Sequence, residues 1–528
     1  MPKNIVIYSD GTGQDGGVRP EQRISNVYKM YRASRVHPDN LIDPREQVCF
    51  YDPGLGTDSG VSALTSLVRW GQKFLQSFTG RGITKNMADC YEFLVNHYEK
   101  DDRIFLVGFS PGAYTVRCLA NTLMLCGIPT RTPNGPLLRY RKSIHDIAKE
   151  AVETVYEHGA GHARAQYEAE RDEQARRFRK KYGSDATEPN ADPDQSNVAT
   201  YFVGVFDTVA ALGASGKRRL VIQLGIAAFF TLGIAIPLSV AAILPSLASK
   251  LALGFGFWWS ELVLTVALVA IANIWFWWKQ HRAYRKEIYD FPNKGDYAWH
   301  NAEWRSENFD RLLSKYVGTA RSANAIDETR KDFDRVAWGS IANADHLAQM
   351  WFAGNHSDVG GSYPEAESRL SDISLQWMIE EMQKLTFPLK LGPVTVHGRQ
   401  ITGTGNEGTP LHLYPAANGA QHCEIAGMRD TLDALAEKWP HFLRGFIATE
   451  NYETITRAVL HNAQIDDTVA ERFALEEVVD CARTGSYRPE ALRGHDKFKH
   501  FYPALPPAVP TAPLGRSEEP AIPTQLPP

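Results

Sequence analysis

The chain has 528 residues and a formal net charge of −4, from 57 basic and 61 acidic side chains. This near balance excludes a protein that binds nucleic acid through a globally basic surface. A chain of this length can bury a large core, and it accommodates an α/β domain with insertions.

Cysteine usage indicates a reducing compartment. No two cysteines form a CxxC pair or a zinc-ligand spacing, and several lie in apolar runs. We therefore expect free thiols. The chain opens almost at once into a predicted strand at residues 4–8, so we expect no secretory signal. The six cysteines are Cys49, Cys90, Cys118, Cys126, Cys423 and Cys481.

The first predicted strand ends in a glycine-rich loop that contains Asp10, Gly11 and Thr12. Open α/β sheets bind ligands at the carboxyl ends of their strands. The Asp-Gly-Thr order is also similar to that of haloacid-dehalogenase phosphatases. Those enzymes need an acidic residue where this chain has Tyr8, so we discount that interpretation. A second glycine-rich loop, at residues 51–57, fits an ordinary turn equally well.

The clearest motif is a Gly-x-Ser-x-Gly sequence centred on Ser110, from Gly108 to Gly112. A buried strand is predicted before it, at residues 104–107, and a helix after it, at residues 113–120. Strand, tight turn and helix around this sequence are typical of a nucleophile elbow, in which a strained turn projects the serine hydroxyl above the sheet edge. The alternative is an ordinary glycine-rich turn.

A serine nucleophile needs a base to take its proton and an acid to orient that base. In α/β hydrolases the chain order is serine, then aspartate or glutamate, then histidine. Ser110, Asp207 and His356 follow this order, and the last two each follow a predicted strand. Taken alone, Asp207 fits a turn cap and His356 fits an ordinary loop. Asp358 is a rival acid, but we expect it to bond its own loop backbone.

Two apolar runs indicate a membrane hairpin. Residues 220–248 carry no charge over 29 positions, and residues 262–278 carry none over 17. A bilayer core about 30 Å thick takes roughly 17–25 apolar residues per helix. Basic residues precede the first run and follow the second, so both ends are expected in the cytoplasm. Tryptophans at the run ends fit the two membrane interfaces. The alternative is a pair of helices buried in the protein or forming an apolar lid.

The remaining segments carry weaker signals. Residues 138–182 are predicted to be helical, with a charged face that fits solvent better than a binding patch. The proline-rich tail from residue 503 is predicted to be disordered. Other predicted elements are a loop at 185–197, an amphipathic helix at 373–385, loop-rich strands at 390–415, and helices at 428–439 and 469–481.

Together these signals predict an α/β-hydrolase-like fold, with a mostly parallel sheet flanked by helices and an inserted transmembrane helical hairpin. The expected domains are the first part of the hydrolase core at residues 1–215, the hairpin at 216–286, the second part of the core with helical additions at 287–502, and the disordered tail at 503–528.

The chain resembles a family of uncharacterised α/β hydrolases that includes type VI secretion phospholipase effectors. The resemblance implies a Ser-Asp-His hydrolase acting on carboxylic esters, expected to be phospholipids, with its triad at Ser110, Asp207 and His356. The matching segments are residues 10–12, 26–28, 51–54, 108–110 with 112–117, 206–209 and 356–361, with a weaker match at 487–489.

One position departs from the family pattern, which usually has arginine where this chain has Pro111. Proline suits the first turn of a helix. However, the N–H of this residue is normally half of the oxyanion hole, and proline has none. Losing one such donor costs roughly 2.7–4 kcal/mol. The other half is expected from Gly11 and Thr12, with Asp10 and Asp358 in support. A slow enzyme, an enzyme with another donor, and a natural or engineered inactive form all stay open.

The leading hypothesis is a membrane-anchored serine esterase of lipase or phospholipase type. Ser110 would attack the ester, His356 would act as base and then acid, and Asp207 would hold the imidazole. We expect a lipid substrate and a membrane as partners, no nucleic acid, no metal and no organic cofactor. The resemblance adds secretion or immunity partners.

The basic flanks predict a bacterial inner-membrane protein with its catalytic domain on the cytoplasmic side. A secreted effector that inserts into a target membrane is the competing placement. Two other functions stay open. One is a degenerate hydrolase domain that serves as a membrane-bound sensor or interaction module. The other is a pore formed by the hairpin, which offers few polar residues to line it.

Overall fold

The computed structural model describes residues 2–11, 24–54, 81–188, 191–209, 231, 242–243, 257–302, 310–338, 346–402, 408, 410–423, 454–481 and 483–503. Three predicted features lie wholly or mostly outside these ranges: the first apolar run, the helix at 428–439 and the tail.

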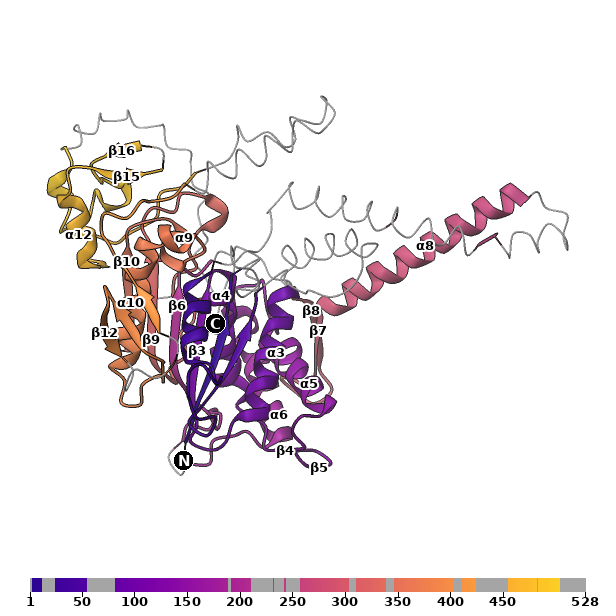
Figure 1. Ribbon diagram of the computed structural model, residues 1–528. Coiled ribbons are helices and arrows are strands. Elements are labelled where there is room, and N and C mark those ends of the chain that lie inside the picture. The colour runs from indigo at the N-terminus through magenta and orange to yellow at the C-terminus, as the bar shows by residue number, and fades with distance from the viewer. Residues whose placement is uncertain are drawn as a thin grey trace, which may run out of the picture.

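A seven-stranded sheet forms the centre of the molecule (Figure 1). Its order is β14-β10-β9-β6-β3-β1-β2, and every neighbouring pair is parallel. This confirms the predicted mostly parallel α/β sheet. The strands are β1 (Asn4–Ser9), β2 (Gln47–Asp52), β3 (Arg103–Phe109), β6 (Thr200–Phe206), β9 (Val317–Ala325), β10 (Leu347–Phe352) and β14 (Gln464–Ile465).

The strand order reverses at β1, because β2 lies on one side of it and all later strands lie on the other. Open α/β sheets bind ligands at such a switch point, beyond the carboxyl ends of the strands. The Asp10 loop follows β1 and Ser110 follows β3, so both lie at this point of the sheet edge.

Side chains alternate between the two faces of the sheet, as the pleat of a strand requires. On β3, Ile104 and Leu106 join one core, whereas Phe105 and Val107 join the opposite core. The first core is covered by α3 (Arg81–His97), α4 (Pro111–Cys126), α5 (Lys142–Lys149), a π-helix (Glu150–Tyr156) and α6 (Arg164–Tyr182). The second is covered by α1 (Asn26–Ser34), α9 (His356–Gly360) and α10 (Arg369–Gln383).

Short elements surround the main sheet. A third core, which includes Trp351, Phe473 and Phe498, joins β10 to the C-terminal elements. These short elements are β4 (Arg131–Thr132), β5 (Gly135–Pro136), β7 (Arg285–Tyr289), β8 (Tyr297–Asn301), β11 (Val394–Val396), β12 (Arg399–Thr402), β13 (Leu411–Leu413), α12 (Asp467–Ala474), β15 (Val478–Asp480) and β16 (Arg483–Gly485).

The predicted helix at residues 469–481 is wrong in its second half. Helix α12 ends at Ala474, and the C-cap residue Leu475 has an extended backbone. The β-branched residues Val478 and Val479 then pair with Gly485 and Thr484 of β16. β-Branched side chains favour strands over helices, and a partner strand is available here.

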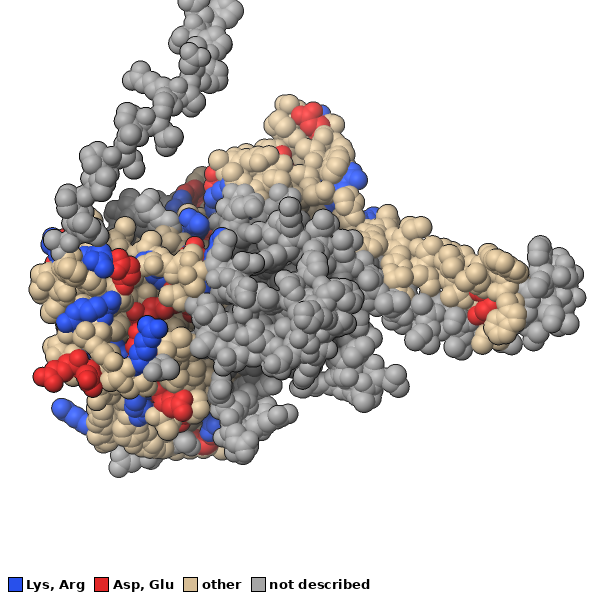
Figure 2. Space-filling model, turned by 90° about the horizontal axis from the view of Figure 1, so that it is seen from above, with Lys and Arg blue, Asp and Glu red and all other residues tan. Residues whose placement is uncertain are grey.

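The second apolar run forms one long helix, α8 (Phe257–Tyr284), which projects away from the sheet (Figure 1). Within the described ranges, only the stretch Trp258–Lys279 is long and apolar enough to cross a membrane, judged by length and composition. None of it is buried in the protein. Figure 2 shows α8 as an arm with charged side chains near its ends. A helix buried in the protein, one alternative for this run, is thus excluded.

The cysteines correct one expectation. Cys423 and Cys481 form a disulfide, with their Cα atoms 4.9 Å apart, so these two are not free thiols. The other four are free, and Cys90, Cys118 and Cys126 are buried. A disulfide is typical of proteins that work in an oxidising compartment.

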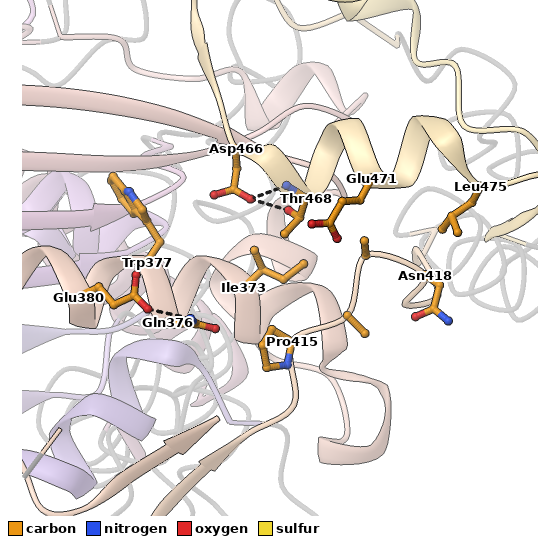
Figure 3. A pocket seen from close by; sticks show the side chains of 12 residues that line it. Ile373, Gln376, Trp377, Glu380, Pro415, Asn418, Asp466, Thr468, Glu471 and Leu475 are labelled. Atoms are coloured by element: carbon orange, nitrogen blue, oxygen red, sulfur yellow. Dashed lines mark hydrogen bonds between the residues drawn. The ribbon is translucent and has the colours of Figure 1, made fainter. Parts of the chain in front are cut away.

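A cavity of about 440 Å³ lies between α10 and α12 (Figure 3). Trp377 and Ile373 line it together with the carboxylates of Glu380 and Glu471. One oxygen of Asp466, which also lines the cavity, accepts hydrogen bonds from the N–H and the hydroxyl of Thr468, so this carboxylate caps α12. The cavity is lined by none of the sequence-predicted site residues.

Candidate active site

Ser110 lies in the turn between β3 and α4, at the carboxyl edge of the sheet. Its φ of 61° and ψ of −130° are strained for a residue with a side chain. The Ser110 N–H donates to the Phe206 carbonyl at 3.2 Å, and the Ala113 N–H donates to the Ser110 carbonyl at 3.1 Å. These bonds hold the serine in the strained strand-to-helix turn that a nucleophile elbow requires.

The two glycines of the motif allow close backbone contacts around this turn. A Cβ on Gly112 would lie 2.2 Å from the Ser9 carbonyl oxygen at the end of β1. A Cβ on Gly108 would lie 2.5 Å from the carbonyl oxygen of Gly112. Any larger residue would therefore push α4 away from β1 and β3, and the position of Ser110 depends on both glycines.

His356 is the first residue of the short helix α9, and its imidazole points at Ser110. Nε2 lies 2.7 Å from Ser110 Oγ. The ring is 3% exposed and lies between two aromatic side chains. It stacks on Phe109 at a centroid distance of 4.7 Å, and Phe333 meets it edge-on at 5.1 Å. These contacts fix the ring plane, while the hydrogen bond fixes its direction.

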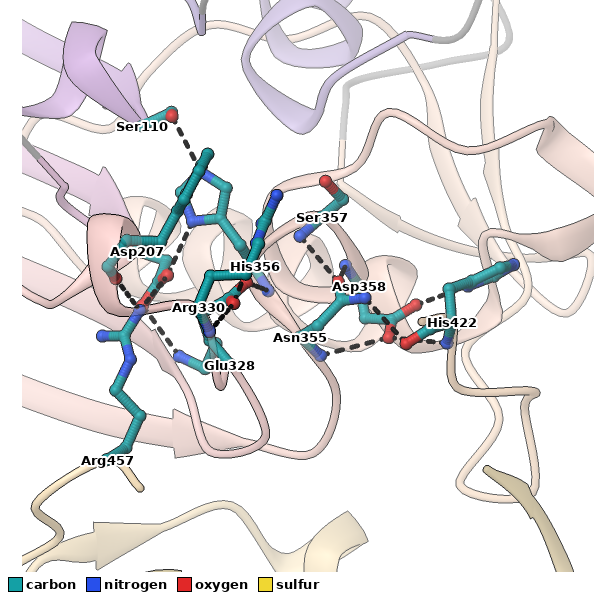
Figure 4. A network of polar contacts seen from close by, with 12 residues as sticks. Ser110, Asp207, Glu328, Arg330, Asn355, His356, Ser357, Asp358, His422 and Arg457 are labelled. Atoms are coloured by element: carbon teal, nitrogen blue, oxygen red, sulfur yellow. Dashed lines mark hydrogen bonds and ion pairs between the residues drawn. The ribbon is translucent and has the colours of Figure 1, made fainter. Parts of the chain in front are cut away.

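Asp207 follows β6 and is fully buried, with a positive φ of 32°. Its Oδ2 lies 2.6 Å from His356 Nδ1, and its Oδ1 accepts the Ala325 N–H at 3.0 Å (Figure 4). Ser110, His356 and Asp207 therefore form a continuous chain of two hydrogen bonds. Such a chain can withdraw the serine proton, because the acid orients the imidazole and stabilises its charged form.

Arg457 is a partner of Asp207 that the sequence did not indicate. Its Nη2 donates to Asp207 Oδ2 at 3.1 Å and to the Phe333 carbonyl at 2.7 Å. Burial alone would raise the pKa of Asp207, but the Arg457 charge and the bonds from His356 and Ala325 outweigh it and lower the pKa to about 2. Asp207 is therefore a carboxylate at neutral pH.

A second buried carboxylate, Glu328, contacts the backbone of the histidine. Its Oε2 accepts the His356 N–H at 3.3 Å and Arg330 Nη2 at 2.7 Å. Burial raises the pKa of Glu328, but its bonds to Arg330 outweigh that effect and lower it. The Arg330 guanidinium also lies 3.6 Å from the Phe333 ring centroid. Glu328 and Arg330 thus support the wall of the site without touching the imidazole nitrogens.

Gly11 and Thr12 are the expected oxyanion donors, but the Gly11 N–H is not free in this structure. The Gly11 N–H already donates to Asp10 Oδ1 at 2.7 Å, and Thr12 lies outside the described residues. Asp10 Oδ2 accepts the hydroxyls of Ser25 and Tyr51 at 2.6 and 2.7 Å. Burial raises the pKa of Asp10 to about 6 despite these bonds. Asp10 therefore organises the loop beside Ser110.

Asp358 bonds its own loop, as predicted, and also a residue that the sequence did not indicate. Its Oδ2 accepts the Asn355 N–H at 3.1 Å, which completes a capping box at the start of α9. Its Oδ1 lies 2.7 Å from Nδ1 of His422 (Figure 4). The rival role for Asp358, as the acid that orients His356, thus finds no support, because Asp207 occupies that place.

Residues 3–231 and 265–381 match the family model described as "T6SS, Phospholipase effector Tle1-like, catalytic domain". The match covers more than half of the chain. The chain belongs to this family of Tle1-like catalytic domains. The gap between the two matched parts, residues 232–264, falls inside the apolar insertion predicted at 216–286. The resemblance stated from the motifs is thereby confirmed.

Individual relatives of this Tle1-like domain are distant. The uncharacterized protein YEL023C of Saccharomyces cerevisiae is 23% identical over 479 residues, which are 82% of this chain and 65% of that protein. A crystal structure of an uncharacterized protein from Pseudomonas aeruginosa is 14% identical, with 74% of this chain and 47% of that chain covered and a TM-score of 0.31. The Tle1 effector bound to the VgrG spike of the type 6 secretion system is 15% identical, with 70% and 53% covered and a TM-score of 0.28.

Two groups of side chains among the described residues have the composition of a metal site: Asp89, Glu92 and His145, and the more buried His158, Glu170 and His300. His158, Glu170 and His300 bring three potential ligand atoms within 4.8 Å of one another. However, His300 Nε2 accepts the Gly159 N–H at 3.0 Å, so the neutral ring carries its proton on Nδ1, the nitrogen nearer Glu170. That nitrogen has no free lone pair for a metal. The group is better described as a hydrogen-bonded cluster.

Proposed function

We propose that this chain is a serine hydrolase that cleaves carboxylic ester bonds of phospholipids. The observation that carries the proposal is the chain of hydrogen bonds from Ser110 Oγ through the His356 imidazole to Asp207. Membership of the Tle1-like phospholipase family supports a phospholipid as the substrate.

In the first half of the reaction, Ser110 Oγ attacks the ester carbonyl carbon while its proton passes to His356 Nε2. The imidazolium that forms donates from Nδ1 to Asp207, whose charge is maintained by Arg457. His356 then gives its proton to the departing alcohol oxygen, and the acyl group remains on Ser110. In the second half, His356 takes a proton from the water that attacks the acyl-serine carbonyl. The bond to Ser110 Oγ then breaks, His356 returns the proton to Oγ, and the fatty acid leaves.

The developing oxyanion is the weak point of this site. Pro111 supplies no N–H, and the Gly11 N–H is bonded to Asp10. Loss of one donor alone lowers the rate by about 10²–10³. We propose a slow enzyme, in which the Gly11 N–H leaves Asp10 when the oxyanion forms.

We further propose that α8 and the preceding apolar run enter a membrane as a hairpin. No part of Trp258–Lys279 is buried in the protein, and water is a poor solvent for so large an apolar surface. The Thr231 hydroxyl, in the first run, donates to Asn273 Oδ1 in α8 at 3.0 Å. Hydrogen bonds between polar side chains commonly join helices in a bilayer. The hairpin would hold the triad near its lipid substrate.

Two placements follow from different observations. The basic residues outside both runs favour the bacterial inner membrane, with the triad on the cytoplasmic side. The Cys423–Cys481 disulfide favours a secreted effector that inserts into a target membrane from an oxidising compartment. We propose the second, because structural disulfides are rare in the reducing cytoplasm. That placement implies secretion partners.

The experiment is hydrolysis of phosphatidylglycerol vesicles by the purified full chain, followed as released fatty acid. Ser110→Ala is the control, and Pro111→Ala raises the sensitivity if the wild type is slow. We expect fatty-acid release that Ser110→Ala abolishes. Equal release by both proteins, or none from the folded wild type and the proline variant, would refute the assignment.

A second candidate is a degenerate hydrolase domain that acts as a membrane-bound sensor. Pro111 and the occupied Gly11 N–H favour it, because both remove oxyanion donors. This candidate predicts vesicle binding without ester hydrolysis in the same assay.

A further inference from the structure

The segment that contains His422 and Cys423 lies between the loop of the proposed catalytic base and a separate β-hairpin. On the first side, the His422 N–H donates to Asp358 Oδ2 at 3.1 Å, and Nδ1 bonds Asp358 Oδ1 at 2.7 Å. The His422 carbonyl accepts Asn355 Nδ2 at 2.8 Å. Three hydrogen bonds from one residue therefore reach the two side chains that cap α9.

These caps matter because α9 has only five residues, and His356 is the first of them. A helix this short has little stability of its own, so its orientation depends on its caps. Asn355 Oδ1 accepts the N–H groups of Ser357 and Asp358, each at 2.9 Å, and Asp358 returns a bond to the Asn355 N–H. Any shift of this capping box, formed by Asn355 and Asp358, therefore turns the imidazole of His356.

His422 also balances the charge of the box. Asp358 is 2% exposed, and an isolated buried carboxylate is unstable. Burial would lower the pKa of His422, but its bonds to Asp358 and to Glu367, 3.1 Å away, outweigh that effect and raise it. The His422 ring stacks on Tyr363 at 3.6 Å. The side chain is thus both a donor to Asp358 and a packed ring.

On the second side, the segment is fastened to the hairpin of β15 and β16. Cys423 is bonded to Cys481, 58 residues away in sequence. Gln421 exchanges backbone bonds of 2.9 Å with Val479 and Cys481. Among the described residues, this disulfide is the only covalent cross-link between the loop of His422 and the hairpin.

One side of the segment faces a cavity. A cavity of about 290 Å³ adjoins the segment and is lined by Glu328, Asn355, His422, Cys423, Arg457 and Cys481. A loop beside an open cavity loses few contacts when it moves. Its position is therefore set by the hydrogen bonds to Asp358, the stack on Tyr363, the backbone bonds of Gln421 and the disulfide.

We infer that His422, fixed by the Cys423–Cys481 disulfide, is a positioning residue for His356. This inference rests on the proposed hydrolase function. Turnover then depends on whether the Cys423–Cys481 disulfide is formed. It also depends on His422, although this residue touches no reacting atom.

The first test compares three variants with matched shapes. His422→Phe keeps the stack on Tyr363 and removes the donor, His422→Asn keeps a donor near the Nδ1 position, and His422→Ala removes both. We expect Phe and Ala to lower kcat roughly 10- to 100-fold with KM unchanged, because a small misplacement of a reacting group has an effect of this size. The Asn variant should recover most of the loss. A Phe variant as active as the wild type would overturn the inference.

The second test opens the disulfide with a small dithiol reductant. The bond between Cys423 Sγ and Cys481 Sγ breaks, each sulfur gains one electron and one proton, and the dithiol becomes a cyclic disulfide. We expect kcat of the wild type to fall about tenfold. The Cys423→Ser, Cys481→Ser double variant should show the lower value with and without reductant. Unchanged kcat after reduction verified by mass spectrometry would contradict the inference.

A third readout separates this inference from the proposed function. The Nδ1 proton shared by His356 and Asp207 should give a far-downfield NMR resonance that His356→Gln abolishes. We expect the resonance to shift or broaden in His422→Phe and in the reduced protein, whether or not lipid is hydrolysed. An unaltered resonance in both would overturn the inference even if the wild type is active. An altered resonance in a protein without esterase activity would instead refute the proposed function.

Discussion

Arg457 Nη2 lies 3.1 Å from Asp207 Oδ2, the same carboxylate oxygen that bonds His356 Nδ1 at 2.6 Å. The arginine is buried, and its Nε and Nη1 have no hydrogen-bond partner within the described ranges. Its main effect on the site is therefore electrostatic, since it keeps a fully buried carboxylate ionised beside the imidazole.

Replacement of Arg457 by methionine should move the acid limit of activity. The pKa of Asp207 is about 2, below its usual 3.8, so its ionised form stabilises the fold above about pH 4, and that contribution is lost as the pH falls toward 2. The difference corresponds to roughly 2 kcal/mol. Without Arg457, burial raises the pKa, so the acid limb of kcat/KM shifts to higher pH.

The pH profile of kcat/KM checks this prediction, together with urea unfolding at pH 4 and pH 7. Arg45→Met is the control, because Arg45 is exposed and remote from the triad in sequence. It lies just before the start of β2, whereas the triad lies at the carboxyl ends of the strands. An unchanged acid limb in Arg457→Met would show that the arginine does not set the charge of Asp207.

Replacement of Pro111 by alanine should raise turnover. Pro111 occupies the first position of α4, where a backbone N–H has no partner inside the helix. Alanine restores that N–H at the position of an oxyanion donor, and the expected gain is about 10- to 10³-fold in kcat. Pro111→Arg, which restores the usual family residue, should act in the same direction.

Turnover of p-nitrophenyl butyrate measures this gain, with Pro136→Ala as a control for loss of a proline at an exposed site in β5. If both Pro111 variants fold and are no faster than the wild type, the elbow N–H is not the missing donor.

Replacement of Gly360 by alanine should disturb the imidazole through Phe109. A Cβ on Gly360 would lie 1.8 Å from Cε2 of Phe109, whose ring stacks on His356. Overpacking of this kind typically costs about 1–3 kcal/mol, and we expect kcat to fall as well because the displaced ring pushes on the imidazole. Differential scanning calorimetry and ester turnover measure the two effects.

Gly494→Ala is the matched control for Gly360→Ala, because no atom lies within 4 Å of its added Cβ. Phe109→Leu combined with Gly360→Ala should restore stability, since leucine frees the space. Full activity and stability in Gly360→Ala alone would mean that Phe109 does not fix the histidine ring.

Acidic substitutions in α8 should release the protein from membranes. Val266 and Ile271 are 59% and 62% exposed in the middle of the helix. A charged residue at the centre of a spanning helix costs roughly 2.5–3.5 kcal/mol, so Val266→Glu with Ile271→Glu should abolish flotation with lipid vesicles. Leu41→Glu, at a 63% exposed site outside the helix, should float like the wild type. Flotation of the double variant would exclude insertion of α8.

The sequence predicts the parts of this site that depend on local chemistry. The turn at Ser110 needs glycines at fixed offsets, and Asp207 and His356 each follow an apolar strand, so motif and strand order suffice to bring them to one sheet edge. Arg457 and His422 reach the site only through tertiary contacts, and neither belongs to a motif. The pairing of Cys423 with Cys481 likewise cannot be predicted from the sequence, because the spacing of cysteines does not show which two are bonded.

The most direct test of the central claim is labelling of the folded full chain by a fluorophosphonate probe, which reacts with activated serines and needs no lipid substrate. The account predicts one labelled residue, Ser110, with labelling absent in Ser110→Ala and strongly slowed in His356→Ala. Labelling that persists in Ser110→Ala, or a wild type that folds and takes no label, would contradict it.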